Sequence, residues 1–574
     1  MAHDEEYRMQ KRCIMNKKLF ALIVLFVGIC ISSAAGISIS NRTVQFCPGS
    51  EGKVGISVRF NSYVEVINPY YCESEDTYYY FLPTALCGGG REVYNDCYEE
   101  LYIDDRKIDK STKFEWEDDV TYKIKNADAE IMAKFMGSSA LPALFISTDT
   151  GSMEQLNLDK FYSERGKIDI FGADGSISYS GGLSLKGRGN TTYGFFEKKP
   201  FNIKLDDAAG ILGMNMDKDW ALLANSWDYS YMNNKLAFDM ASKAGFDYVP
   251  EAEYADVYFN GDYWGIYLVA ERVEVDENRI DITDLKKKNQ EANPDMDISA
   301  AETFDYGNKR GVYLDNVPDD ITGGYLLERD YRLDPNYEGS RKMTTSYFET
   351  PDFGTCISIK SPEYASEEEV DYICDLTNEM EQAITSPDGY SESGEYYLDY
   401  IDLDSWVKWY MVAEIAYDLD KDKTNTYFYK DRDEMDTKFY IGPVWDYDNR
   451  FGGTKSYASA EILTKLELGG GGWVRCLYEK PEFFNAVCQE WNAYFKDYLR
   501  EDAQRNIDLW QEEISRSVKM DNVRWYRGAG YPVMWPSDGD VFVTEYDFND
   551  EVEHLRNWVS TRCDFLDTYW GKEG

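Results

Sequence analysis

Short apolar and aromatic runs, broken by turn-forming residues, dominate the first part of the chain. Between residues 41 and 135, runs such as Val54–Phe60 and Tyr78–Leu82 are separated by Gly, Pro, Asn and Asp, a pattern typical of strands joined by turns. Beyond this region the runs lengthen and helical patterns begin. We therefore expect a small β-rich, sandwich-like domain over residues 36–138 and a second domain over residues 139–574.

A helix and a hairpin are predicted in the first half of the second domain. Residues Tyr229–Ala244 have a helical pattern, and two apolar runs, Tyr254–Phe259 and Tyr263–Val269, flank Asn260-Gly261. Asn-Gly is strongly favoured in two-residue hairpin turns. The polar, acidic stretch 284–320 is interpreted as a surface insertion without chemistry.

Helical periodicity dominates the remainder of the chain. Apolar residues recur at three- and four-residue intervals over 367–386, 403–417, 481–499 and 552–570. The predicted fold class is therefore α+β, with a mixed lobe over about residues 139–330 and a mostly helical lobe over about residues 331–574.

The strongly acidic composition excludes a nucleic-acid function. Sixty basic and 105 acidic residues give a formal net charge of -45, and this field repels DNA, RNA and anionic membrane surfaces. It also repels nucleotides, so a phosphate site needs local Arg or Lys side chains or a divalent cation. His554 is the only histidine after residue 35, and no GxxxxGK[ST] loop occurs, which argues against histidine-based hydrolysis and P-loop chemistry.

The first 35 residues have the zones of a signal peptide. Basic residues precede the apolar run Leu19–Ile31, and the small residues Ser32–Ala35 follow it. Met15 is an alternative start. An uncleaved signal anchor is the competing interpretation, although a spanning helix needs about 20 apolar residues and this run is shorter. We expect an exported protein, either secreted or held at the cell surface.

Export would permit disulfide bonds. After residue 35 the chain has nine cysteines, an odd number, so at least one would stay free or pair between chains. Four of them are close enough in sequence to cross-link the first domain in one of three pairings: Cys47, Cys72, Cys87 and Cys97.

Two acidic segments flank a predicted pair of short strands in the second domain. Asp420 and Asn425 precede the first strand, and Asp446 and Asp448 follow the second. A hairpin would bring both segments to the same end of the strands. Phosphoryl transfer needs a carboxylate that orients the acceptor hydroxyl and oxygen ligands for Mg²⁺. The five-residue separation of Asp420 and Asn425, which matches that of the protein-kinase catalytic loop, therefore predicts such a site.

Seven motifs follow one another along the second domain: KGRGNTT (186–192), KPFNIKL (199–205), WALLAN (220–225), NKLAF (234–238), NGDYWGIY (260–267), GGYLLE (323–328) and PVWDYD (443–448). Together they resemble the spore-coat CotH kinase family over about residues 141–570. The resemblance implies an atypical protein-kinase-like, two-lobed fold that phosphorylates Ser or Thr hydroxyls of protein substrates. It places Asp420 at the catalytic aspartate, and Asn425 and Asp446 at the positions that hold Mg²⁺ or Mn²⁺. Asp448 is an alternative or second metal ligand.

Three residues of the mixed lobe are predicted to contact the ATP nucleotide. Arg188, between two glycines, offers a guanidinium to a phosphate. Lys204 occupies the place of the phosphate-pairing lysine of a kinase β3 strand, with Lys199 as its rival and a solvated lysine as the alternative. Glu271 would lie near the hinge between the lobes, unless it forms only a surface ion pair.

Two departures from the common kinase pattern are clear. No His-Arg-Asp triplet precedes Asp420, and the full GxGxxG loop is absent, so the chain differs from an ordinary eukaryotic-type kinase. The literal Asp352-Phe353-Gly354 precedes the predicted catalytic loop instead of following it, and we interpret it as a coincidence.

The function predicted on these grounds is an exported CotH-family kinase that uses ATP and Mg²⁺ or Mn²⁺ to phosphorylate Ser or Thr of surface, coat or secreted proteins. The alternative is a kinase-like surface protein that has lost catalysis and binds a wall component or a partner through the β-rich N-terminal domain. A carboxylate-pair glycosidase would suit the aromatic content of 16%, but the chain has no ordered glycosidase motif.

Overall fold

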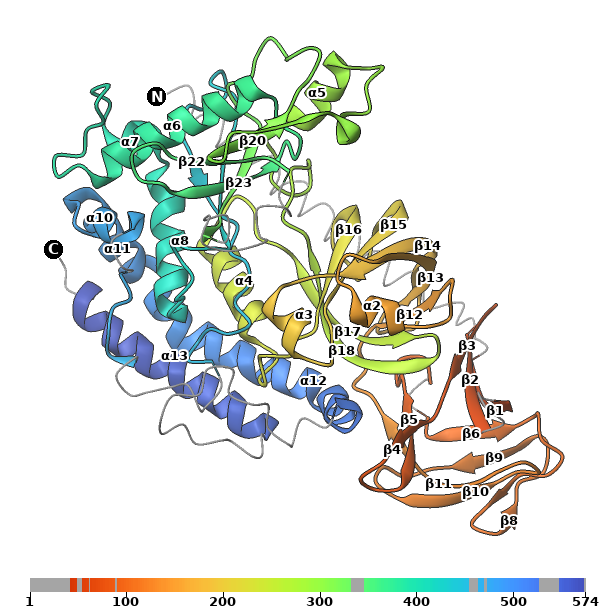
Figure 1. Ribbon diagram of the computed structural model, residues 1–574. Helices are drawn as coiled ribbons and strands as arrows, with labels where there is room; N and C mark the ends of the chain where they lie inside the picture. Colours follow the sequence, from red (N-terminus) through yellow and green to blue (C-terminus); the bar gives the residue numbers. More distant parts are fainter. Residues whose placement is uncertain are drawn as a thin grey trace, which may run out of the picture.

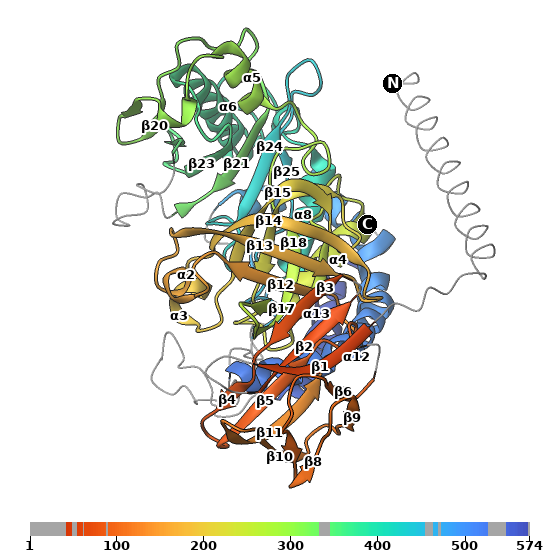
Figure 2. The same cartoon turned by 90° about the vertical axis from the view of Figure 1, so that its right-hand side faces the viewer.

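The computed structural model describes residues 42–48, 54–60, 62–87, 90–331, 345–453, 463–468, 472–525 and 547–571. These residues form a pair of N-terminal sheets, a closed barrel, and a seven-stranded sheet accompanied by helices (Figure 1). In two perpendicular views the barrel lies between the N-terminal sheets and the seven-stranded sheet (Figure 2). The α+β class and the β-rich N-terminal region are thus confirmed, whereas the predicted signal segment lies outside the described residues.

The strands of the N-terminal sheets are β1 (Arg42–Pro48), β2 (Val54–Phe60), β3 (Tyr63–Ile67), β4 (Tyr70–Cys72), β5 (Thr77–Leu82), β6 (Glu92–Asn95), β7 (Tyr102–Ile103), β8 (Arg106–Lys107), β9 (Thr112–Glu115), β10 (Thr121–Lys125) and β11 (Glu130–Gly137). One sheet has the order β3-β2-β1-β6-β9 and the other β4-β5-β11-β10-β7-β8. Both contribute to one aromatic core, in which Tyr80 and Trp116 stack on the ring of Phe135 with centroid distances of 4.9 and 5.8 Å.

The barrel consists of β12 (Ala143–Thr148), β13 (Ser163–Phe171), β14 (Ile177–Gly187), β15 (Phe201–Gly210), β16 (Met216–Leu223), β17 (Ala252–Phe259) and β18 (Asp262–Glu271). It closes in the order β12-β13-β14-β15-β16-β18-β17. Alternate residues of β13 are buried, as expected for a strand with one face toward a core. Leu144, Ile168, Leu183 and Trp220 are among the residues that fill this core.

The predicted hairpin is confirmed. Strands β17 and β18 pair in antiparallel register, and Asn260 and Gly261 between them both have positive φ, 53° and 86°. This is the geometry of the turn for which Asn-Gly is favoured. The predicted helix over 229–244 forms as α4 (Asn233–Ala244), which starts later because the buried carboxylate of Asp228 accepts hydrogen bonds from the backbone of the preceding turn.

The seven-stranded sheet has the order β19-β20-β22-β23-β21-β24-β25. Its strands are β19 (Thr303–Asp305), β20 (Lys309–Val312), β21 (Tyr325–Arg329), β22 (Tyr347–Glu349), β23 (Cys356–Ser361), β24 (Thr426–Lys430) and β25 (Tyr440–Ile441). The interpretation of residues 284–320 as a surface insertion was wrong in part. They form α5 (Leu285–Ala292) and two strands of this sheet, and Leu285, Phe304 and Val312 are buried in the process.

The four predicted helical segments are all helical in the structure. They correspond to α6 (Glu367–Thr385), α8 (Leu403–Ala416), the consecutive helices α11 (Pro481–Glu490), η5 (Trp491–Phe495) and η6 (Tyr498–Asp502), and α13 (Phe548–Trp570). The other helices of this part of the chain are α7 (Tyr397–Tyr400), α10 (Trp473–Tyr478) and α12 (Ala503–Trp525). Helix α6 starts with a capping box between Ser366 and Glu369. Helix α8 is buried over most of its length and forms part of the largest apolar core.

Helix α12 contacts all three parts of the chain. Its Ser517 accepts a hydrogen bond from the backbone of Ser139, just beyond the N-terminal sheets. Asp521, four residues later, pairs with the barrel residue Lys198 at 2.7 Å. On its other side the helix packs against α13, as both views show. The helix therefore joins the N-terminal sheets and the barrel to the C-terminal helices.

Within the described residues, no helix combines the length and apolarity needed to cross a bilayer. The nine cysteines from Cys47 to Cys563, all within the described residues, form no disulfide in the structure.

Candidate functional site

The β24–β25 hairpin brings the two predicted acidic segments together. Phe428 lies opposite Ile441 in antiparallel register, so the start of β24 and the end of β25 are at the same end of the pair. There, Asn425 Nδ2 donates a hydrogen bond of 2.8 Å to Asp446 Oδ2. The contact predicted from the spacing of the two segments is present.

The backbone at both positions is left-handed. Asn425 has a φ of 58° and Asp446 a φ of 69°, in a region that non-glycine residues seldom adopt but that Asn and Asp tolerate best. Asn425 directly precedes β24, whereas Asp446 lies in the segment that follows β25. Both side chains are half-buried and meet beside the hairpin.

Asp420 is linked to the same end of the hairpin through Arg450. Asp420 Oδ2 accepts a hydrogen bond of 2.7 Å from Arg450 Nη2, and Arg450 Nε donates to Asp418 Oδ1. The carbonyl of Asp420 accepts from the amides of Lys423 and Thr424 at 2.9 and 3.0 Å, which closes a tight turn before Asn425. The two acidic segments thus share one buried guanidinium.

Asp448 lies close to Asp446 in a crowded acidic environment. Burial, followed by the negative charge of Asp446, raises the pKa of Asp448 to about 7. Its Oδ2 accepts a hydrogen bond of 3.4 Å from Thr192 Oγ1, at the start of α3 (Thr191–Phe195). A cation bound between Asp446 and Asp448 would offset the repulsion between their charges, which is the second cause of this raised pKa after burial. Together with the Asn425 amide oxygen they offer the oxygen ligands that Mg²⁺ prefers.

Arg188 provides positive charge beside these carboxylates. Its guanidinium lies over the ring of Trp445, 5.3 Å from the centroid. Burial lowers its pKa, and the charges of Asp446 and Asp448 act in the opposite direction. The guanidinium makes no hydrogen bond or ion pair with another residue in the described part of the chain, so its N–H groups can donate to a phosphate oxygen.

A cleft of about 960 Å³ separates the barrel from the seven-stranded sheet. Basic side chains line it on both sides, which meets the requirement for local positive charge in this acidic protein: Lys186, Lys204 and Arg272 from the barrel, and Lys286, Lys287 and Lys360 from the facing side. Arg272 also acts electrostatically on Arg188, so the cleft and the carboxylate cluster lie near each other.

Lys204 and its rival Lys199 occupy different environments. Lys204 lines the cleft, is 59% exposed, and pairs with Asp219 at 2.6 Å. Lys199 Nζ instead donates to the carbonyl of Tyr193 at 2.6 Å and lies over the same residue's ring. Of the two, only Lys204 has its ammonium group at the cleft.

Glu271 is buried at the end of β18 and does not line the cleft. Arg279 Nη1 donates to its Oε1 at 2.5 Å, while Tyr248 and the amide of Glu251 donate to its Oε2 at 3.2 and 3.1 Å. Burial raises its pKa to about 7. Glu271 and Arg279 thus form a fully buried ion pair, not the surface ion pair given as the alternative.

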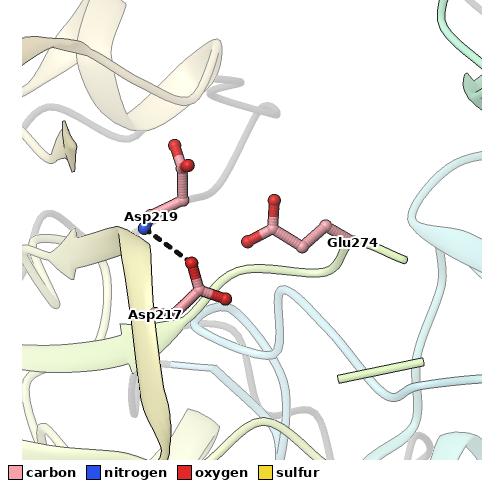
Figure 3. A group of neighbouring side chains, drawn as sticks. All are labelled: Asp217, Asp219 and Glu274. Atoms are coloured by element: carbon pink, nitrogen blue, oxygen red, sulfur yellow. Dashed lines mark hydrogen bonds between the residues drawn. The ribbon is translucent and has the colours of Figure 1, made fainter. Parts of the chain in front are cut away.

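The structure contains a second acidic cluster that the sequence analysis did not single out. Asp217, Asp219 and Glu274 have carboxylate oxygens within 4.8 Å of one another (Figure 3). Asp217 and Asp219 alternate along β16, and this spacing in a strand puts two side chains on one face. Cations already neutralise the cluster, since Lys204 and Arg272 contact Asp219 at 2.6 and 2.9 Å. Each of its three carboxylates could still supply one oxygen to a cation.

Carboxylate and amide oxygens here lie near basic side chains, and these are the groups with which proteins bind divalent cations and phosphates. The family described as CotH kinase protein matches residues 185–566, two thirds of the chain, and the chain belongs to this family. Asp420, Asn425, Asp446 and Asp448 all lie within the matched residues. No curated protein matches the chain.

Proposed function

We propose that this chain is an exported protein kinase that transfers the γ-phosphoryl group of ATP to Ser or Thr hydroxyls of coat, surface or secreted proteins. One observation carries the proposal. Asn425 and Asp446, which come from opposite sides of the hairpin, touch at 2.8 Å, and Arg450 links the same end of the hairpin to Asp420. This convergence supplies a base and metal ligands within one small region.

Asp420 is the proposed catalytic base. Its Oδ2 bonds to Arg450, whereas its Oδ1 makes no hydrogen bond with any described residue, and 42% of the side chain is exposed. Oδ1 can therefore accept the proton of an acceptor hydroxyl as the oxygen attacks the γ-phosphorus. Proton removal and alignment of the hydroxyl are the contributions required of this residue.

Asn425, Asp446 and Asp448 are the proposed ligands of Mg²⁺ or Mn²⁺. The hydrogen bond from Asn425 Nδ2 to Asp446 leaves the amide oxygen of Asn425 free to act as a ligand. Burial, together with the neighbouring charge of Asp446, raises the pKa of Asp448, and a bound cation would favour its ionised, metal-binding form. When bound, the ion would neutralise charge on the phosphate oxygens.

The basic cleft is the proposed ATP site. In this arrangement the barrel acts as the first lobe of a kinase-like fold, and the seven-stranded sheet with its helices acts as the second. Arg188 and Lys204 would bind phosphate oxygens. Asp219, across the strand pair from Lys204, holds that lysine in the way that a carboxylate holds the phosphate-binding lysine of protein kinases. Glu271 is proposed to support the wall of the cleft from within.

Transfer of radiolabelled phosphate from ATP to a mixture of secreted and surface proteins tests the proposal. The wild-type chain should label Ser or Thr only with Mg²⁺ or Mn²⁺ present, and Asp420→Asn and Asp446→Ala should each abolish labelling. Asp352→Asn is a matched control, because Asp352 lies in an exposed turn and bonds only to Asn378 and Gln382 of α6.

Labelling that survives Asp420→Asn or Asp446→Ala would disprove the catalytic assignment. An inert wild-type chain that still binds wall material would favour the non-catalytic surface protein, in which the N-terminal sheets contact a cell-surface partner.

A further inference from the structure

A buried arginine connects the proposed catalytic loop to the proposed metal-binding turn. Arg450 follows Asp448 by two residues and is only 7% exposed. Its guanidinium donates to Asp418, to Asp420 at 2.7 Å, and to the carbonyl of Asn449 at 2.9 Å. Each of its three nitrogens therefore has a partner, and two of the partners are carboxylates.

The backbone of Arg450 is fixed as well. Asn233, at the start of α4, donates through Nδ2 to the carbonyl of Arg450 at 3.0 Å and to that of Asp448 at 3.2 Å. The amide of Arg450 donates to the carbonyl of Tyr447 at 3.2 Å. Both the backbone and the guanidinium of Arg450 are thus held by hydrogen bonds, which leaves the planar guanidinium little freedom to rotate.

Asp418 adds a second constraint on Asp420. Asp418 Oδ1 accepts a hydrogen bond of 2.9 Å from the Asp420 amide and also receives the Arg450 Nε donor. The backbone and the carboxylate of Asp420 are therefore both tied to the same pair of side chains. Without Arg450, the half-exposed side chain of Asp420 would be free to change rotamer, because no other described residue bonds to its carboxylate.

We propose that Arg450 is a positioning residue for phosphoryl transfer. It fixes Asp420 Oδ2 so that Oδ1 faces the acceptor hydroxyl, and it keeps this carboxylate in register with the turn that carries Asp446 and Asp448. The inference rests on the proposed function. It predicts a role in the chemical step, and no role in binding the nucleotide or the metal ion.

Steady-state kinetics of the full chain test this role. Arg450→Met should lower kcat about 100-fold, the loss typical of a catalytic group displaced by about 1 Å, while the KM for ATP changes less than about threefold. Arg450→Lys retains one charge but cannot hold both carboxylates, and it should recover only part of the loss. Arg556→Met is a matched control, since Arg556 of α13 pairs with Asp508 of α12 instead of with either acidic segment.

A second variant separates positioning from folding. Arg450→Met leaves Asp418 buried without its cation, which can unfold the site. The double variant Arg450→Met/Asp418→Asn removes that unpaired charge. It should unfold at a urea concentration near that of the wild type and still show the low kcat.

Three results would overturn the inference: full kcat in the folded double variant, a rise in the KM for ATP that accounts for the whole loss, or complete rescue by lysine. These differ from failure of the proposed function, in which the wild-type chain transfers no phosphate or Asp446→Ala remains active. In that case the positioning role is refuted as well.

Discussion

Breaking the buried Lys198–Asp521 pair should destabilise the junction between the barrel and α12 severely. The two side chains are 1% and 0% exposed and lie 2.7 Å apart. Asp521 also accepts hydrogen bonds from Tyr231 Oη at 2.7 Å and from the amide of Ile266 at 3.1 Å. Asp521→Ala would leave the lysine charged and buried without its counterion. The expected loss in the free energy of unfolding is about 3 to 5 kcal/mol.

Helix α12 supplies its own control. Lys519 pairs with Asp119 of the N-terminal region at the same 2.7 Å, but these side chains are 56% and 64% exposed. Water screens such a pair, so Lys519→Ala should cost at most about 1 kcal/mol. The assay is urea unfolding followed by tryptophan fluorescence, because Trp525 of α12 packs against Trp264 of the barrel with centroids 5.4 Å apart.

Equal losses for the two variants would refute this reasoning, because burial would then make no difference to the strength of the pair. A further check is Lys198→Met/Asp521→Asn, which removes both charges. This double variant should regain part of the stability that Asp521→Ala loses.

Three further predictions concern a buried carboxylate and the proposed ATP site. Burial raises the pKa of Asp256 from its ordinary 3.8 to about 7, so ionisation destabilises the fold increasingly between these pH values and fully above pH 7. The free energy of unfolding of Asp256→Asn minus that of the wild type should therefore be on the order of 2 kcal/mol more favourable at pH 8 than at pH 5, measured by urea unfolding. The same difference at both pH values would contradict this. Lys204→Met should raise the KM for ATP about tenfold, whereas Lys199→Met should leave it unchanged; the reverse order would identify Lys199 as the phosphate ligand. Arg188→Gln should weaken ATP binding about tenfold in calorimetry, since a bidentate phosphate contact is lost, and unchanged affinity would place Arg188 outside the site.

The core of the site was predictable because it depends on local spacing. Two short strands joined by a polar turn are expected to pair as a hairpin, and this pairing brings the segments that carry Asn425 and Asp446 toward the same end of the strands. Positive φ at the Asn-Gly turn of β17 and β18 follows from the sequence in the same way. These predictions needed no information about tertiary packing.

The links between distant segments were not predictable. Arg450 follows Asp420 by 30 residues in the sequence, and nothing in its local pattern distinguishes it from a surface arginine. Residues 284–320 look polar enough for a solvated loop, yet Leu285 and Phe304 suffice to fix them to the seven-stranded sheet. The environment of Glu271 could not be predicted from the sequence either, because its buried ion pair with Arg279 forms only in the folded chain.

Calorimetric titration of ATP, with and without Mg²⁺, tests the central claim most directly. The wild-type chain should bind ATP at least about tenfold more tightly when Mg²⁺ is present, because Asn425, Asp446 and Asp448 would hold the ion against the phosphates. Asp446→Ala should remove that difference. If the wild type binds ATP equally well without the ion, or if Asp446→Ala retains the full Mg²⁺ effect, the convergence of the two acidic segments has no role in binding a metal-bound nucleotide.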